Sequence, residues 1–506
     1  MSTAPSRAGE IHHSARIGPL RSIFSFPVML CGMLAVLSVL TVRDRFDDPD
    51  MWWHLKMGEV IATTHRIPTT DLFSYTTNHH AWVPHEWLSQ VLIYEAYKWG
   101  SYTGLMLWLC FFTSLLIIAG YALCALYSGN AKTALVGALV VWFFSTTGDA
   151  IRPQLIGYLC LTLELLLVHL GSTRSPRWFL WLPPLFAVWV NCHGSFFLGI
   201  LLLVLFLSCS FFEFRMGSLV ASRWDARGRK MLALALVLSV AALFVNPVGI
   251  DQVLYPVRVF GHLPLNLALV DEWKPVEITS LRGVGLLAML GLVFLIEVIR
   301  RSDLYWHELL LIAMGAEMAV SHRRMLFVFG ILAAPVFARL IADLWDSYDI
   351  KRDLPAANAV LLALSAVIVV AAFPKRASLV EQMNKSSPVK AVEFIKEHHL
   401  TGNMLNAYGY GGYLIWALPE HPVFIDGRGD VFEWTGVFGD FAKWMTLQSD
   451  PRLLLDKYNI GFCVIERESP MTPVLKLLPG WQLVYSDEQS AIFERSASVG
   501  VKGLAK

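Results

Sequence analysis

The sequence predicts a multi-pass α-helical membrane protein with a soluble α/β domain at its C-terminal end. Of the 506 residues, 55% are hydrophobic and 16% are charged, whereas soluble domains carry about 25% charged residues. Apolar runs that approach the roughly 20 residues needed to cross a bilayer recur along the chain, so we expect about eleven spans. The tail from Pro374 onward instead alternates short apolar stretches with polar ones.

We therefore divide the chain into a transmembrane domain, residues 1–373, and a C-terminal domain, residues 374–506. The predicted spans are centred near Leu34, Thr113, Val140, Thr162, Ala187, Leu202, Val237, Leu290, Ile312, Gly330 and Ser365.

The orientation follows from lysine and arginine, which concentrate in short cytoplasmic loops. One loop, Arg215 to Lys230, holds five basic residues, against three arginines in the turns STTGDAIRPQ, NCHGS and SHRR together. This places the N-terminus in the cytoplasm and the C-terminal domain outside a cytoplasmic (inner) membrane, in contact with membrane lipids. A long first outer loop, residues 43–102, lies on the same side as the tail.

Two helices are expected in the first outer loop. MWWHLKMGEVIATTHRIP and HEWLSQVLIYEAYKWG both carry Trp, Leu, Ile and Tyr at helical spacing. Helices so rich in tryptophan should lie along the membrane interface. The alternative is that they form a belt that only anchors the loop.

The tail is expected to combine short strands with helices, as in a small α/β layer. SPVKAVEFIKEHH and the stretch Arg452 to Tyr458 are typical of helices. The expected strands are NMLNAY, YLIWAL, PVFID, GFCVIER, WQLVYSD and SAIFER.

Composition also excludes some classes of function. The net charge of +1 gives no basic surface for nucleic acid. The seven cysteines form no CxxC pair, which argues against a disulfide framework or a zinc site.

Carboxylates gather directly after the first span, in DDPDMWWHLK. Asp48 and Asp50 flank a proline and can face one cation, as hard oxygen ligands for Mg²⁺ or Mn²⁺. Asp149, in TTGDA, is a third candidate ligand from another outer loop. The alternative is that these residues cap the helices that begin near Met51 and Arg152.

Basic side chains stand at the outer ends of other spans. Arginine binds phosphate through a planar fork of donors, so we expect Arg152, His193, Arg323 and Arg324 to converge on a phosphate head group. The alternatives are snorkelling of the arginines to the interface and a tight turn at NCHGS with a satisfied histidine.

These motifs resemble those of the GT-C glycosyltransferase superfamily, whose members share the long first outer loop, its two interface helices and an outward soluble domain. The stretch from Asp50 to Lys56 is similar to the D-x-Y-Y-H-x-R motif of archaeal oligosaccharyltransferase catalytic subunits. The resemblance implies that Asp50 binds metal and acceptor, with Asp48 as a second catalytic residue and His54 near the substrate. Tyr408 to Gly412 replaces the WWDYG motif of those enzymes, so the resemblance gives no support for recognition of an asparagine sequon.

The expected function is transfer of a sugar or glycan from a polyprenyl-(di)phosphate carrier to a glycan, lipid or protein acceptor at the outer membrane face. Asp50 would act as base, or as the metal-anchored group that orients the acceptor, and one direct displacement would invert the sugar carbon. The main alternative is a transporter or flippase for a lipid-linked or small polar substrate, and a further one is a non-catalytic scaffold. Transporters hold their polar groups near the bilayer midplane, whereas here these groups cluster at one surface.

Overall fold

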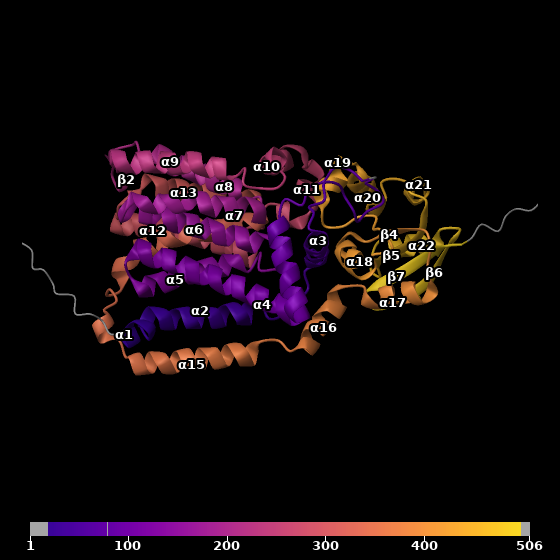
Figure 1. Ribbon diagram of the computed structural model, residues 1–506, viewed down its shortest axis with the longest axis horizontal. Coiled ribbons are helices and arrows are strands. Elements are labelled where there is room, and N and C mark those ends of the chain that lie inside the picture. Colours follow the sequence, from indigo (N-terminus) through magenta and orange to yellow (C-terminus); the bar gives the residue numbers. More distant parts are fainter. Residues whose placement is uncertain (1–18, 78, 497–506) are drawn as a thin grey trace, which may run out of the picture.

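The computed structural model describes residues 19–77 and 79–496, so the expected cytoplasmic N-terminus lies outside the described residues. All eleven predicted span centres lie within helices, which run side by side along the long axis of the molecule (Figure 1). These helices are α2 (Phe26–Val42), α4 (Trp87–Ser128), α5 (Ala131–Ser145), α6 (Gln154–Thr173), α7 (Leu182–Cys192), α8 (Phe196–Cys209), α9 (Ala226–Ala242), α12 (Leu281–Arg300), α13 (Trp306–Ser321), α14 (Leu326–Leu340) and α15 (Pro355–Ala372).

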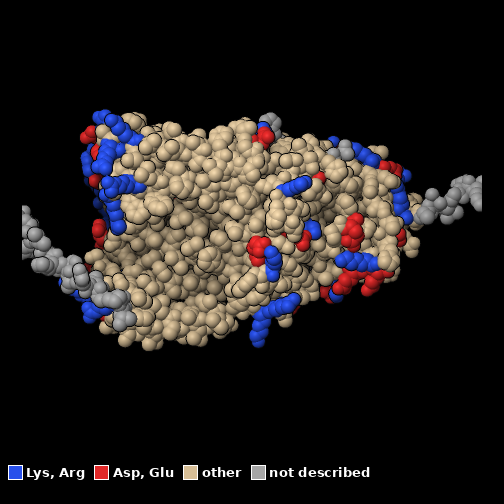
Figure 2. Space-filling view, in the orientation of Figure 1, with Lys and Arg blue, Asp and Glu red and all other residues tan. Residues whose placement is uncertain are grey.

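Four of these helices, α4, α6, α12 and α15, are long and apolar enough to cross a membrane by themselves, and α2, α5 and α8 are shorter apolar helices. The count of eleven crossings therefore stays a prediction. Figure 2 shows a broad band without charged side chains over the helices, with charged side chains gathered toward the two ends of the molecule. This band has the character of a surface that faces lipid.

The centre of the helical bundle is α14, which is buried on nearly every side and packs against α4, α5 and α13. The outer helix α12 has the opposite character, because Leu281, Phe294 and Ile299 are largely exposed. Exposed apolar side chains of this kind are stable in contact with lipid tails rather than water.

The first outer loop contains two helices in the expected ranges, α3 (Met51–Thr64) and the beginning of α4. The backbone of α4 breaks at Ser101, where φ is 52° and ψ is −140°. The part before the break runs across the ends of the bundle helices (Figure 1). The same end of the bundle carries α10 (Ile250–His262) and α11 (Pro264–Leu269), while α1 (Pro19–Ile23) lies at the other end.

The far end of the bundle also carries a small sheet of the order β1-β2-β3. Its strands are β1 (Phe214–Met216), β2 (Leu219–Ala221) and β3 (Leu304–Tyr305). The hairpin β1-β2 falls in the basic loop that sequence analysis assigns to the cytoplasmic side.

The tail forms a four-stranded sheet of the order β4-β5-β7-β6, in which β4 and β5 are parallel and the other pairs are antiparallel. Register is fixed by pairs such as Met404 with Phe462 and Cys463 with Phe493, all buried. The strands are β4 (Asn403–Asn406), β5 (Ile460–Glu466), β6 (Trp481–Ser486) and β7 (Ser490–Arg495). The helices are α16 (Arg376–Ser386), α17 (Val389–His398), α18 (Gly411–Ala417), α19 (Gly429–Trp434), α20 (Val437–Met445), α21 (Pro451–Lys457) and α22 (Met471–Leu477).

Two of the expected tail strands are wrong. YLIWAL forms helix α18, because Tyr413 and Trp416 lie three residues apart and pack edge-on against Trp52 and Tyr97 of the first loop. PVFID forms only an isolated bridge, from Val423 to Ser74. Short apolar runs do not distinguish strand from helix by periodicity, and here contacts with the first loop decide.

Candidate active site

A cavity of about 600 Å³ opens where the first loop, the ends of the bundle helices beside it and the tail meet. Its polar lining comes from all three regions and includes Asp50, Glu86, Arg152, Arg324 and Asp430. The rest of its lining is largely apolar and comes from α8, α13, α14 and the segment 255–273, namely Phe197, Leu198, Leu201, Met314, Met318, Val328, Val259, Leu263, Leu267 and Val270. The cavity therefore combines a polar part with an apolar part.

Asp48 and Asp50 have different roles in the turn before α3. Both carboxylate oxygens of Asp48 accept from Arg152, from Nε at 2.6 Å and from Nη2 at 2.7 Å. Asp48 Oδ1 also accepts the backbone N–H of Asp50 at 3.1 Å. Asp50 occupies the N-cap position of α3, but its side chain makes no cap hydrogen bond. Its carboxylate instead lines the cavity, so capping does not account for it.

Asp50 is held from both of its carboxylate oxygens. Trp53 Nε1 donates to Oδ1 at 3.3 Å, and Arg152 Nη1 lies 3.1 Å from Oδ2. Burial raises the pKa of Asp50 to about 6; the Arg152 cation opposes this shift, and Asp48 and Glu272 add to it. A carboxylate whose pKa lies this close to neutral is suited to accept a proton and release it again.

Arg152 lines the cavity and is paired with carboxylates, and its expected role as a phosphate ligand stays a prediction. Besides Asp48 and Asp50 it donates from Nη1 to Glu272 Oε1 at 2.9 Å. Nε, Nη1 and one N–H of Nη2 thus face carboxylates, so most of the guanidinium donors are already engaged. In this structure Arg152 orients the acidic residues.

His193 and Arg324 also line the cavity, whereas Arg323 does not. Arg324 donates to Gln154 Oε1 at 3.3 Å and lies 4.3 Å from the ring centre of Trp273, and it makes no salt bridge within the described part of the chain. Arg323 is exposed, and its backbone N–H bonds to Lys274 O. The structure thus gathers three of the four expected phosphate ligands at one cavity, and of its two arginines only Arg324 has no carboxylate partner within the described part of the chain.

Three histidines surround the buried carboxyl group of Glu86. Its Oε1 lies 3.4 Å from His193 Nε2 and 3.7 Å from His85 Nε2, and its Oε2 lies 3.9 Å from His54 Nδ1. Burial raises the pKa of Glu86 to about 8 and lowers the pKa of His85 and of His193 to about 3. At neutral pH this cluster is therefore largely uncharged.

The turn at NCHGS provides a hydrogen-bond partner for the ring of His193 and also directs this side chain into the cavity. The backbone N–H of Ser195 donates to His193 Nδ1 at 3.1 Å. The neutral ring then carries its proton on Nε2, where it can donate to Glu86. His54 has its own partner, since Gln90 Nε2 lies 3.2 Å from His54 Nδ1.

Glu86 and His85 are missing from the site expected from sequence. The signal that could have found them is the pair of polar residues in PHEWL, directly before the apolar face of the second interface helix. Tyr255 and Asp430 are further additions, because Tyr255 Oη and Trp82 Nε1 both donate to Asp430 Oδ2, at 2.9 and 3.2 Å.

The expected metal site on Asp48, Asp50 and Asp149 is not assembled in this structure. Asp149 lies outside the cavity lining, and its Oδ2 accepts from Ser145 Oγ at 3.4 Å. It does not cap α6 either, since that helix begins at Gln154 after Pro153. Within residues 19–77 and 79–496, no three His, Cys, Asp or Glu side chains are arranged to hold a metal ion. The residues present therefore do not fit Mg²⁺ or Mn²⁺ bound by these three carboxylates.

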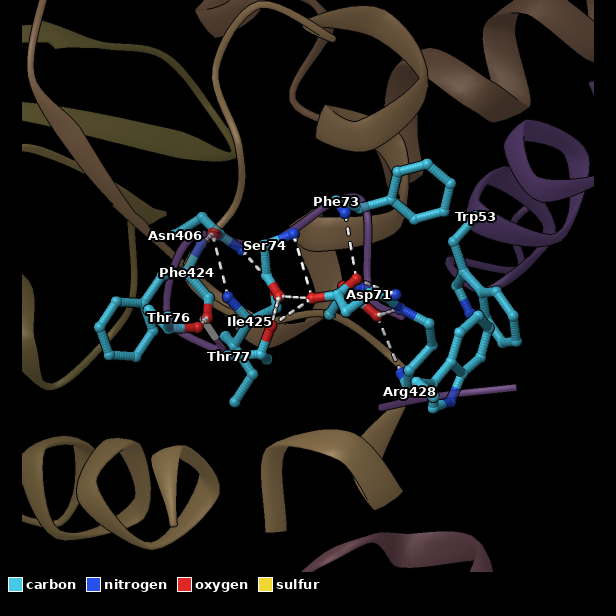
Figure 3. Close-up of polar contacts among 12 residues, drawn as sticks. Trp53, Asp71, Phe73, Ser74, Thr76, Thr77, Asn406, Phe424, Ile425 and Arg428 are labelled. Carbon is cyan, nitrogen blue, oxygen red and sulfur yellow. Dashed lines mark hydrogen bonds and ion pairs between the residues drawn. The ribbon is translucent and has the colours of Figure 1, made fainter. Parts of the chain in front are cut away.

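A second arginine cluster is centred on Arg428, a residue that also belongs to the cavity lining. Arg428 donates to both oxygens of Asp426, at 2.8 and 2.6 Å, and to Asp71 Oδ1. Asp71 also accepts from the side chains of Ser74 and Thr77 (Figure 3). These charged groups are fully buried, so the cluster joins the tail to the first loop.

Several solved structures have a fold similar to that of this chain. The oligosaccharyltransferase of Archaeoglobus fulgidus tethered to an acceptor peptide is 14% identical, with a TM-score of 0.53 over 94% of this chain and 75% of that one. The same enzyme with an inhibitory peptide and dolichol-phosphate is 13% identical, with a TM-score of 0.50 over 94% and 74%. ArnT from Cupriavidus metallidurans bound to undecaprenyl phosphate is 12% identical, with a TM-score of 0.50 over 92% and 98%.

The chain has a GT-C-like fold. The likeness covers both the helical bundle and the tail, since nine-tenths of this chain is aligned in each comparison. No protein-family model and no curated protein matches the sequence. The four helices that are long and apolar enough to cross a membrane fit a membrane protein.

Proposed function

We propose that this protein is a membrane glycosyltransferase that moves a sugar from a polyprenyl-phosphate carrier to an acceptor hydroxyl. The observation that carries the proposal is the composite cavity, in which the Asp50 carboxylate and the Arg324 cation share one space with a long apolar wall. A lipid-linked sugar has the same division, with an apolar chain, a phosphate and a polar sugar. The solved neighbours with dolichol-phosphate and with undecaprenyl phosphate support the same class of donor.

Asp50 is the proposed base. As the acceptor oxygen bonds to the anomeric carbon, Asp50 takes the hydroxyl proton, and the bond from that carbon to the phosphate oxygen breaks. The electron pair leaves with the phosphate, and a single displacement inverts the sugar carbon. Asp48 accepts hydrogen bonds from Arg152 with both of its carboxylate oxygens and so fixes the guanidinium, which in turn orients Asp50.

Arg324 and His193 are the proposed ligands of the leaving phosphate. Arg324 makes no salt bridge among the described residues, so its cation is available to an anion that enters the cavity. The neutral ring of His193 has one N–H, on Nε2, which would turn from Glu86 Oε1 at 3.4 Å to the phosphate. A cation already held beside the position where negative charge develops, such as that of Arg324, lowers the barrier because it needs no reorganisation during the reaction.

The apolar part of the cavity is the proposed place of the first isoprene units. Leu198 and Leu201 from α8 face the cavity together with Met314 and Met318 from α13. Met side chains adapt to irregular apolar ligands because they are unbranched and polarisable. This part suits an isoprenoid better than a small polar substrate, which argues against transport of a small polar substrate; the assay described below separates transfer from flipping of a lipid-linked one.

We also infer that the outer face holds the cavity, with residues 1–373 as the membrane domain and 374–506 as the extracytoplasmic domain. Eleven crossings from a cytoplasmic N-terminus are consistent with the basic side chains that predominate at the far end of the bundle (Figure 2). Labelling of cysteines in intact cells tests this. Lys476→Cys, exposed in the tail, should react with an impermeant maleimide, and Arg227→Cys should not. If only the Arg227→Cys protein reacted, the true topology would be the inverse of the one inferred here.

The proposed function is tested with purified protein in liposomes that contain a panel of tritiated polyprenyl-phosphate monosaccharides and an envelope lipid extract as acceptor. We expect label to move from the carrier to a product of different mobility. A flippase would instead change the leaflet of the carrier without separating the sugar from it. Label that stays on the carrier with every sugar in the panel, while the carrier changes leaflet, would replace the proposal by the transport alternative.

A further inference from the structure

Three glycines of the tail form bare backbone in the cavity wall, at points where a side chain does not fit. A Cβ on Gly412 would overlap the backbone oxygen of Pro49, and a Cβ on Gly427 would overlap Asp50 Oδ1. A Cβ on Gly429 would overlap the side chain of Asn266, which donates to Gly429 O at 2.9 Å. The tail thus closes directly onto the acidic stretch of the first loop.

Gly427 differs from Gly412 in what it meets. The obstacle at Gly412 is backbone, which moves only if the tail moves. The main obstacle at Gly427 is the end of the Asp50 side chain, which can rotate, and Trp53 Nε1 also lies close, at 3.1 Å from the added Cβ. Gly427 is also absent from the glycines of positive φ in the described chain. Space beside Asp50, rather than backbone conformation, is therefore what favours glycine at this position.

We propose that Gly427 is a positioning residue, whose missing side chain lets the tail hold the Asp50 carboxylate against Arg152 and Trp53. This inference rests on the proposed function, in which Asp50 accepts the proton. Asp50 Oδ2 faces Arg152 at 3.1 Å, and Oδ1 is enclosed by Trp53 Nε1 at 3.3 Å and by Gly427. The tail is then a part of the catalytic site and not an appended module.

The inference predicts a specific defect for Gly427→Ala. The new methyl group displaces the carboxylate by rotation about its side chain, while the apolar wall and Arg324 keep their places. Misplacement of a reacting group by about 1 Å can cost roughly a hundredfold in rate. We therefore expect kcat to fall by about 10- to 100-fold with KM nearly unchanged, and the acid limb of the pH profile to move.

Two other alanine variants make the test specific. In Gly439→Ala, on α20 and outside the cavity lining, the new methyl group meets only Leu265 Cδ1 at 3.5 Å, so activity and melting temperature should stay at the wild-type values. In Gly412→Ala the methyl group pushes on backbone, so the melting temperature should fall. Gly427→Ala should melt with the wild type.

A structure of the Gly427→Ala protein supplies a reading that does not depend on turnover. We expect the Arg152–Asp50 contact to be lost while the Arg152–Asp48 contact remains. Any of three results would overturn the inference. The Gly427→Ala protein could keep the wild-type kcat, its melting temperature could fall as much as that of Gly412→Ala, or Asp50 could keep its wild-type position in the variant structure. If the wild-type protein transfers no sugar at all, the proposed function fails, and the position of Asp50 in the variant structure still decides the role of Gly427.

Discussion

Two arginines of this protein, Arg152 and Arg428, each lie between carboxylates, yet their surroundings give them different roles. Arg428, Asp71 and Asp426 are fully buried. Arg152 joins Asp48, Asp50 and Glu272 at the edge of a cavity, where the side chain of Asp50 is 22% exposed. The first cluster fixes the tail to the first loop, and the second leaves one carboxylate facing an open space.

Residue types alone therefore do not decide whether an ion cluster is structural or functional. In the buried cluster each carboxylate oxygen of Asp71 has more than one partner: Oδ1 accepts from Arg428 and from the backbone N–H of Phe73 at 3.0 Å, and Oδ2 accepts from the side chains of Ser74 and Thr77 (Figure 3). In the cavity cluster Asp50 shares a single guanidinium nitrogen with Glu272. The carboxylate that is less completely paired is the one that can exchange a proton.

The largest expected effect is on the buried cluster. Arg428→Ala leaves two carboxylates without their cation in a fully buried place, which costs about 3–5 kcal/mol of folding stability. The melting temperature in detergent should fall sharply. The matched control is Arg452→Ala, because Arg452 forms an exposed ion pair with Asp450 in the same domain and such pairs contribute little. Equal melting of the two variants would remove the contrast between the clusters.

The next effect concerns the phosphate ligand at the cavity. Arg324→Ala should lower transfer by roughly 10- to 100-fold, because a preorganised cation is lost from the developing charge. Arg323→Ala is the control, since this neighbouring arginine is exposed and lies outside the cavity lining. Similar rates for the two variants would argue against a phosphate site at Arg324.

The dependence of kcat/KM on pH is expected to be a smaller effect. The pKa of Asp50 is raised to about 6, and only its ionised form accepts a proton. The value of kcat/KM should therefore rise with pH through about 6, and below this pH fall about tenfold per unit. A profile that is flat from pH 5 to 7 would contradict the assignment of Asp50 as base.

The smallest effect separates Asp48 from Asp50. The charge of Asp48 raises the pKa of Asp50, so Asp48→Asn should move the acid limb of the profile to lower pH. The loss of rate at neutral pH should be about tenfold or less, because Asp48 acts through Arg152 and does not touch the reacting atoms. If the acid limb of the pH profile moved to higher pH instead, the charge of Asp48 would not be what raises the pKa of Asp50.

The fold could be predicted in large part, because a bilayer demands long apolar runs and these are visible in a sequence. All eleven expected centres lie in helices. The helix α18 was not predictable, since its register depends on Trp52 and Tyr97, more than 300 residues away in the chain. A short apolar run carries no information about such partners.

The candidate site could be predicted only in the parts that stand beside span ends. Asp50, Arg152, His193 and Arg324 each follow or precede an apolar run, and the topology alone assigns them to one face. Contacts between distant segments could not be predicted, such as Tyr255 with Asp430. The ion pairs of Arg152 could not be predicted for the same reason. The local sequence IRPQ does not indicate that Asp48 and Glu272 contact this arginine in the folded protein.

Asp50→Asn removes the proposed base, the carboxylate that takes the proton from the acceptor hydroxyl. Asparagine keeps the size and much of the hydrogen bonding of aspartate, and it serves equally well at a helix N-cap. Transfer from the tritiated carrier should fall by roughly a hundredfold or more, with the melting temperature of the wild type. Transfer near the wild-type rate by a stably folded Asp50→Asn protein would contradict the claim.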